Sequence, residues 1–221
     1  MIIIGVDDAG RGPVIGPMIL AGVLIKKETE DFFQSSGVKD SKSLTHKRRI
    51  ALSRLIIDNS IDFKIEVVPV REINELMQAG TNLNTIEAIK TAKIINYLNK
   101  RQEKIKVIVD CPSVNIHNWK KELLNFIEKK ENLEVICEHK ADINYPSVSA
   151  ASIIAKVERE KIIESLKKRY GDFGSGYPSD PSTIKFLKEN GKRLEKEELF
   201  REHWITWKKF FPETKQSTLK L

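Results

Sequence analysis

Cysteine and long apolar runs are both scarce in this sequence. Only two cysteines, Cys111 and Cys137, occur among 221 residues, and they fit neither a metal-binding spacing nor a disulfide framework. Each stands at the end of an apolar run, which favours a role as a small buried hydrophobic residue. No apolar run is long enough to span a membrane, and no basic segment precedes the first one. The sequence therefore predicts a globular protein of the cytoplasm.

Acidic residues are in the minority. The chain has 38 Lys and Arg against 31 Asp and Glu, a net charge of +7. A basic surface suits a polyanion such as nucleic acid. A lysine-rich surface that serves solubility alone is the alternative, and charge by itself does not exclude it. Internal repeats are also lacking, and the length suits one domain with a small appendage.

Apolar patterning predicts a sheet with helices on both faces. The expected strands are 2–8, 18–25, 61–70, 105–110 and 133–137. The expected helices are 28–35, 46–58 with Thr45 as N-cap, 71–78, 84–100, 119–129, 147–170, 182–189 and 195–210. The strand at 61–70 alternates Ile61, Phe63, Ile65 and Val67 with polar neighbours, which indicates one wet face. The short link 14–17 favours an antiparallel first pair, and the later strands, each preceded by a helix, favour parallel addition.

Four acids stand at the ends of predicted strands. Asp7 and Asp8 end the first strand, Asp110 ends the fourth, and Asp142 follows the fifth. Side chains of adjacent strand residues point to opposite faces, so Asp7 and Asp8 can converge only where the strand stops or bends. The glycines at 10 and 12 supply such a bend. A solvated strand end is the alternative for each acid alone. Together they predict a Mg²⁺ or Mn²⁺ site, because crowded carboxylates favour a hard cation. Two such ions can bracket a phosphodiester.

Five motifs follow one another in order along the chain. They are 7–12 (Asp-Asp-Ala-Gly-Arg-Gly), 40–44 (Asp-Ser-Lys-Ser-Leu), 138–142 (Glu-His-Lys-Ala-Asp), 149–156 (Ser-Ala-Ala-Ser-Ile-Ile-Ala-Lys) and 174–180 (Gly-Ser-Gly-Tyr-Pro-Ser-Asp). One Gly-Arg-Gly alone would carry little weight. In this order, and with His203-Trp204 beyond them, the motifs resemble ribonuclease HII, specifically its archaeal form.

The resemblance implies an α/β fold, the ribonuclease H-like mixed five-stranded sheet flanked by helices, over residues 1–180. A C-terminal helical extension would occupy 181–212 and a flexible tail 213–221. The implied activity is that of a metal-dependent, monomeric ribonuclease H of type 2. It would hydrolyse the RNA strand of RNA–DNA hybrids and cut 5′ to ribonucleotides embedded in duplex DNA, leaving 3′-hydroxyl and 5′-phosphate ends.

The resemblance also assigns roles to particular residues. The metal ligands, for Mg²⁺ or Mn²⁺, would be Asp7, Asp8, Asp110 and Asp142. The substrate-binding residues would be Gly10, Arg11, Gly12, Lys42, Lys140, Lys156 and Tyr177. In this scheme the Gly-Arg-Gly backbone surrounds the ribonucleotide 2′-hydroxyl, the tyrosine recognises the RNA–DNA junction, and the lysines face phosphates.

The chain departs from the family pattern at two places. The family has Asp-Glu where this chain has Asp7-Asp8, so the second carboxylate is one methylene shorter. A weakly active or non-catalytic hybrid-binding protein is therefore the alternative function. Within nucleases, the alternatives are a junction resolvase and ribonuclease HIII. Residues 216–221 (Gln-Ser-Thr-Leu-Lys-Leu) resemble the start of a sliding-clamp motif without its aromatic anchor, and a frayed basic terminus is the other interpretation.

Overall fold

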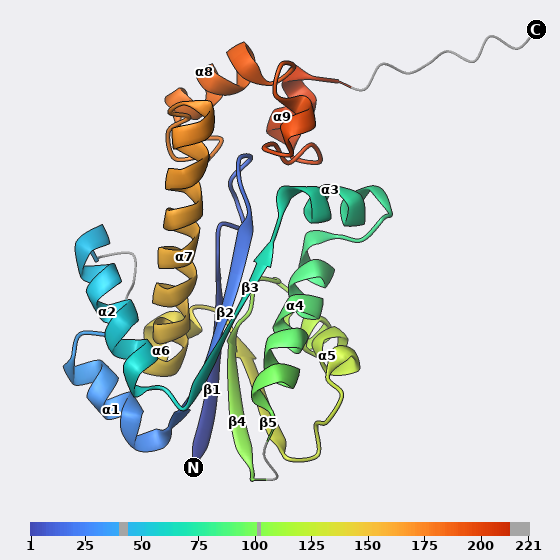
Figure 1. The fold of residues 1–221 in the computed structure, drawn as a ribbon. Helices are drawn as coiled ribbons and strands as arrows, with labels where there is room; N and C mark the ends of the chain where they lie inside the picture. Colours follow the sequence, from blue (N-terminus) through green and yellow to red (C-terminus); the bar gives the residue numbers. More distant parts are fainter. Residues whose placement is uncertain (40–43, 101–102, 213–221) are drawn as a thin grey trace, which may run out of the picture.

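A five-stranded mixed sheet forms the centre of the molecule (Figure 1). The computed structural model describes residues 1–39, 44–100 and 103–212. The strands are β1 (Ile2–Ala9), β2 (Met18–Lys26), β3 (Asp62–Val68), β4 (Ile105–Asp110) and β5 (Leu133–Glu138), in the spatial order β3-β2-β1-β4-β5. β2 pairs antiparallel with β1 and β3, whereas β4 pairs parallel with β1 and β5. The predicted mixed sheet is confirmed.

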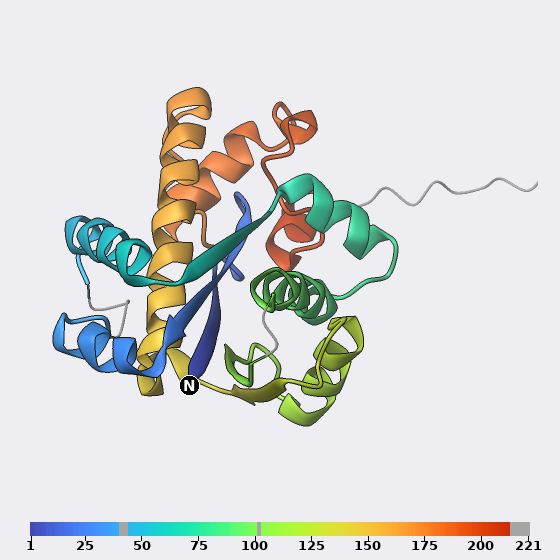
Figure 2. The ribbon, with the colours of Figure 1, turned by 60° about the horizontal axis from the view of Figure 1, so that its bottom comes forward.

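Helices cover both faces of this sheet, as Figures 1 and 2 show. One layer contains α1 (Lys27–Ser35), α2 (His46–Asn59), α6 (Ala141–Asn144) and α7 (Pro146–Tyr170). The other contains α3 (Val70–Gln78), α4 (Leu83–Leu98) and α5 (Ile116–Phe126). Each layer encloses its own apolar cluster against the sheet. Thr45 caps α2 by accepting a hydrogen bond from the Arg48 amide, as predicted.

The first turn of α7 lies directly on β1. A Cβ atom at Gly5 would stand 2.3 Å from the carbonyl carbon of Ser147 and 2.6 Å from the amide nitrogen of Val148. These neighbours are backbone atoms, so no side chain could rotate away to make room. Glycine therefore allows backbone-to-backbone contact here. The small residues that follow in α7, Ala150 and Ala151, are fully buried against the same face.

The C-terminal part packs as a separate apolar cluster beyond the tip of the β1–β2 hairpin. It contains α8 (Pro181–Asn190), the 3₁₀ turn η1 (Glu195–Glu197) and α9 (Ile205–Phe210). The predicted helix over 195–210 is wrong, because only its two ends are helical. Between them, residues 199–201 are extended: Ile15 pairs with Phe200, and the Arg201 amide donates to Val14 O at 2.9 Å. This pairing satisfies backbone groups that a helix would have bonded internally.

One further prediction fails at the end of β3. Val67 was expected on the buried face, yet its side chain is 41% exposed, and its neighbours Glu66 and Val68 are the buried residues. Lys64 and Lys93 both pair with the Glu66 carboxylate and so stabilise it in this position.

Of the helices in the described ranges, none is both long and apolar enough to cross a membrane.

Candidate functional site

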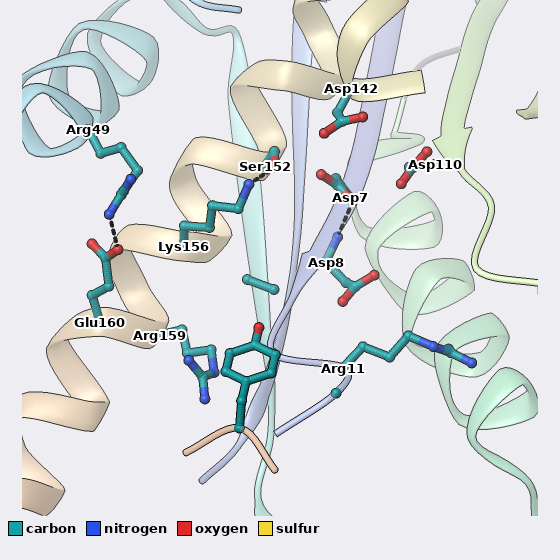
Figure 3. A pocket seen from close by; sticks show the side chains of 14 residues that line it. Asp7, Asp8, Arg11, Arg49, Asp110, Asp142, Ser152, Lys156, Arg159 and Glu160 are labelled. Carbon is teal, nitrogen blue, oxygen red and sulfur yellow. Dashed lines mark hydrogen bonds and ion pairs between the residues drawn. The ribbon is translucent and has the colours of Figure 1, made fainter. Parts of the chain in front are cut away.

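A cleft of about 480 Å³ opens beyond the carboxyl ends of β1 and β4 (Figure 3). Ligands of such sheets bind at this edge. The lining residues are Asp7, Asp8, Ala9, Gly10, Arg11, Gly12, Arg49, Asp110, Asp142, Ser152, Lys156, Arg159, Glu160 and Tyr177. The four predicted metal ligands and five of the seven predicted substrate-binding residues therefore share one cavity.

The strand register brings the acids together. Val6 of β1 aligns with Val109 of the parallel strand β4, so the next residues, Asp7 and Asp110, reach the same edge. The Ala141 amide donates to Asp110 Oδ1 at 2.8 Å and thereby ties α6, which carries Asp142, to the end of β4. Asp7 and Asp142 are both buried. Side chains far apart in the sequence thus meet through sheet pairing and one short helix.

Asp8 differs from the prediction in one respect. β1 continues through Ala9, so no bend separates Asp7 from Asp8, which pair in regular register with Ala21 and Leu20 of β2. Their side chains leave the strand on opposite faces, and the Asp8 amide donates to Asp7 Oδ1 at 2.7 Å. Asp8 borders the main cleft and also a small cavity of about 10 Å³ on the α4 side, shared with Glu87.

The acid cluster is electrostatically crowded. Burial and the nearby charge of Asp8 raise the pKa of Asp7 well above its ordinary value, although a hydrogen bond from Ser152 lowers it in part. Burial also raises the pKa of Asp8 to about 6, against the opposing effect of the Arg11 charge. Protons are held tightly here because ionised carboxylates repel one another and are poorly solvated. A cation would relieve both costs.

These residues fit a divalent metal by their chemistry. Carboxylate oxygens are the ligands that Mg²⁺ and Mn²⁺ prefer, and the raised pKa values of Asp7 and Asp8 indicate negative charge without sufficient compensation. Within residues 1–39, 44–100 and 103–212, no three His, Cys, Asp or Glu side chains already form a closed metal shell. A bound ion would therefore draw the carboxylates together from the positions that they occupy here.

The Gly10–Gly12 loop forms the second side of the cleft. Gly10 has a φ of +84°, which disfavours a side chain, and a Cβ atom there would lie 2.2 Å from Arg159 Nε. The Arg11 side chain turns away toward α4, where it forms an ion pair with the buried Glu87 and donates to Asn84 Oδ1 at 2.8 Å. These contacts anchor the arginine and leave the loop backbone facing the cleft.

Tyr177 and Arg159 close the far end of this loop. A Cβ atom at Gly12 would lie 3.3 Å from the Tyr177 ring, so the two motifs are in contact. The Arg159 guanidinium lies 5.8 Å from the centre of that ring. Its Nε and Nη2 atoms are buried without a hydrogen-bond partner, which is unusual for a charged group. Burial lowers the pKa of Arg159. The guanidinium is therefore placed to bind an anion.

The predicted lysines have three different outcomes. Lys156 lines the cleft, and its Nζ is 3.2 Å from Ser152 Oγ (Figure 3). Lys140 is exposed and is not among the residues that line the cleft, and it takes a left-handed φ of 58° just before α6. Lys42 lies outside the described residues, and its role stays a prediction.

Sequence reasoning missed several residues of the cleft. Three of them, Ser152, Arg159 and Glu160, lie on α7 at helical spacing from the predicted Lys156. This spacing places them on one helix face and could have revealed the arginine from the recognised lysine. Arg49 of α2 forms an ion pair with Glu160 across the two helices. No local pattern could have indicated that contact, because 111 residues separate the pair.

Comparisons with known proteins show which family the chain resembles. The sequence profile of the family described as Ribonuclease HII matches residues 4–207. The chain is 44% identical to a ribonuclease HII of Methanocaldococcus jannaschii, over 99% of both chains. Its structure is similar to that of ribonuclease H2 from Pyrococcus horikoshii OT3, with a TM-score of 0.85, 39% identity, and coverage of 95% of this chain and 97% of that one.

A second solved structure is that of the PCNA:RNase HII complex from Archaeoglobus fulgidus. The TM-score is 0.81 at 40% identity, over 92% of this chain and 95% of the matched chain. Both structures have the mixed sheet with C-terminal helices that this chain has. Sequence profile, relatives and structure all support one assignment: this chain belongs to the ribonuclease HII family and is an enzyme of the type 2 ribonuclease H kind.

Proposed function

We propose that this enzyme hydrolyses the RNA strand of RNA–DNA hybrids and cuts 5′ to a ribonucleotide embedded in duplex DNA, leaving 3′-hydroxyl and 5′-phosphate ends. The observation that carries the proposal is the shared cleft, in which the acid cluster and the Gly10–Gly12 loop face one another. One side can hold metal ions at a phosphodiester. The other can contact the 2′-hydroxyl that distinguishes RNA from DNA.

In this proposal, Asp7, Asp8, Asp110 and Asp142 hold two divalent cations. The metals would supply an activated water nucleophile and stabilise charge on the leaving oxygen. The protein positions the scissile phosphate between the carboxylates and the cationic side chains of Lys156 and Arg159. Unpaired Arg159 N–H groups support a phosphate contact, because a buried guanidinium without acceptors needs one.

Recognition is assigned to the loop backbone and Tyr177. Arg11 is anchored on Glu87, so the loop offers backbone groups rather than its own guanidinium to the ribose. The Tyr177 ring packs against Gly12. Its side chain is 40% exposed, which leaves part of the ring available to the nucleotide beside the ribose. Ring and loop together would recognise the junction between RNA and DNA.

One digestion tests the proposal. Duplex DNA with a single embedded ribonucleotide is incubated with the full chain in Mg²⁺ and, separately, in Mn²⁺, and both product ends are mapped. The expected result is one cut 5′ to the ribonucleotide, with 3′-hydroxyl and 5′-phosphate ends. Duplex DNA without ribonucleotide is the control. Binding to the hybrid without any cleavage in either metal would instead support the non-catalytic function that the shorter Asp8 suggests.

A sliding clamp is the proposed protein partner. The similar chain from Archaeoglobus fulgidus was solved as a complex with PCNA, and residues 216–221 of this chain resemble the start of a clamp-binding motif. Gln216→Ala should weaken association with a clamp while leaving hydrolysis of short substrates unchanged. If the variant and the parent chain bind the clamp equally well, residues 216–221 are not the docking motif.

A further inference from the structure

The carbonyl groups of the Gly10–Gly12 loop all bond to the C-terminal extension. The Arg201 side chain donates to Gly10 O at 2.6 Å and to Arg11 O at 2.9 Å. Trp204 Nε1 donates to Gly12 O at 3.0 Å. Every backbone oxygen of the loop therefore has a side-chain donor that comes from about 190 residues away in the sequence.

Arg201 is unusual in itself. It is the largest fully buried side chain in the described part of the molecule, at 0% exposure. A third hydrogen bond, from Nε to Gly16 O at 2.9 Å, uses the remaining edge of its guanidinium. No carboxylate in the described ranges forms an ion pair with it. The backbone oxygens and the Trp204 ring, whose centre lies 4.8 Å from the guanidinium, compensate the buried charge. Burial and the nearby charge of Arg159 lower its pKa to about 9, so it remains charged at neutral pH.

Residues 14–16 connect the C-terminal extension to the loop that carries Tyr177. The amides of Val14 and Ile15 donate to Gly176 O at 2.9 and 3.3 Å, and the amide of Gly16 donates to Leu199 O at 3.1 Å. Residues 14–16 thus bind the extension on one side and the Tyr177 loop on the other. The three nitrogens of the Arg201 guanidinium lie in one rigid plane, which suits them to hold three carbonyl groups in fixed positions.

We propose that Arg201 and Trp204 are positioning residues for ribonucleotide recognition. By holding the carbonyl side of the Gly10–Gly12 loop, they orient its N–H side toward the cleft. The C-terminal extension is then part of the recognition site and not only a support for the fold. This inference rests on the proposed function, in which that loop contacts the ribose.

The test compares variants that act on the loop with one that does not. Arg201→Lys keeps the charge but loses the planar fork, and Trp204→Phe removes the single donor to Gly12. The matched control is Leu194→Ala, which removes a buried side chain of the same C-terminal cluster without removing a donor to the loop. All chains are compared at a temperature well below the lowest melting temperature.

Two measurements separate positioning from stability. The first is kcat and KM on duplex DNA with one ribonucleotide. The second is the ratio of Kd values for that duplex and for all-DNA duplex, measured without metal. Arg201→Lys should lower kcat by about tenfold or more and lower the ribonucleotide preference, with little change in Kd for all-DNA duplex, because small misplacements of a reacting group are costly. Trp204→Phe should produce a smaller loss of the same kind.

Leu194→Ala should lose melting temperature but keep both the preference and kcat. Equal losses in this control, at an equal fall in melting temperature, would overturn the inference, and so would an unchanged preference in Arg201→Lys. If Arg201→Lys does not fold, Trp204→Phe decides by the same criteria. A parent chain that does not cleave the substrate would refute the proposed function. A parent chain that cleaves, with variants that keep its preference, would refute only the positioning role.

Discussion

The two sides of the cleft are built in different ways. The acids stand on regular elements: Asp7 and Asp110 lie in adjacent strands, and Asp142 lies on a helix that is bonded to the end of β4. The recognition loop belongs to no strand or helix, and donors from the extreme C-terminal part of the chain hold it. The comparison teaches that sheet pairing and one short helix position the acids, whereas tertiary contacts from a distant segment position the Gly10–Gly12 loop.

The largest expected effect is on the acid side. Asp7→Asn should lower cleavage by about a thousandfold or more, because it removes one of the proposed metal ligands where charge develops in the transition state. Kd for all-DNA duplex should change little, because phosphate contacts supply that affinity. Rates are measured with saturating metal. Retention of full activity would mean that the acids do not hold the catalytic metals.

On the recognition side, Tyr177→Ala should lower cleavage at a single embedded ribonucleotide by about ten- to a hundredfold. Tyr177→Phe, which keeps the ring against Gly12, is the matched variant that separates stacking from the hydroxyl group. Rates on the single-ribonucleotide duplex are compared with affinity for plain duplex DNA. A parallel loss in both would indicate that the tyrosine only supports the loop structure.

Asp8→Glu tests how closely the acid side must fit its metal. The longer side chain reaches about 1.5 Å further, roughly one carbon–carbon bond. Because Mg²⁺ requires near-ideal octahedral geometry, this variant should cleave faster, by roughly tenfold in Mg²⁺ and less in Mn²⁺. Turnover of both proteins is measured side by side in each metal. Slower cleavage in both metals would show that the surrounding backbone is adapted to the shorter acid.

Metal-free stability should also respond to Asp8. Its pKa is raised to about 6 in the folded chain, so the stability associated with its protonated form is full below about pH 4 and is lost as pH rises through 6. Asp8→Asn cannot ionise and should keep that stability. Its melting temperature should exceed that of the parent chain by a few degrees at pH 7.5 and by little at pH 4. An equal gain at both pH values would contradict the raised pKa.

The smallest effect is expected for Lys140→Ala. The side chain is exposed and does not line the cleft, so a phosphate contact there would be screened by salt and worth about twofold in affinity. Lys156→Ala, inside the cleft, is the matched comparison and should lose more. Affinity for duplex DNA is measured at two salt concentrations. A larger loss for Lys140→Ala would extend the nucleic-acid interface beyond the cleft.

Sequence patterns predicted the acid side well, for a physical reason. Strand periodicity and strand ends are local features, and β4 was predicted with its observed bounds, Ile105–Asp110. Thr45 was identified as a cap because capping depends on the next three residues. The register that aligns Asp7 with Asp110 then follows from parallel pairing. Local information was sufficient for these features, whereas it failed at Val67 of β3, next to the buried Glu66 that Lys64 and Lys93 pair with.

The recognition side could not be predicted in the same way. Arg201 reads as one more surface cation in a basic chain, and nothing nearby in the sequence indicates that it is fully buried. The pattern over 195–210 favours a helix, yet tertiary pairing with residues 14–16 keeps 199–201 extended. Glu87 likewise looks like a solvated helix residue until Arg11 is seen to pair with it. Contacts between distant segments determine the burial and conformation of these residues, and local sequence periodicity does not indicate such contacts.

The bond between Arg201 and Gly10 spans 191 residues of sequence and so has a consequence for biosynthesis. The N-terminal strands leave the ribosome first, and domains form as their segments become available. The sheet and its acids can assemble from residues 1–170 while the chain is still being translated. The Gly10–Gly12 loop, which we propose contacts the ribonucleotide, gains its donors only when Arg201 and Trp204 have been made. In this scheme the acid cluster forms before the Gly10–Gly12 loop is fixed. Selectivity for the ribonucleotide is then the last property that the nascent enzyme acquires.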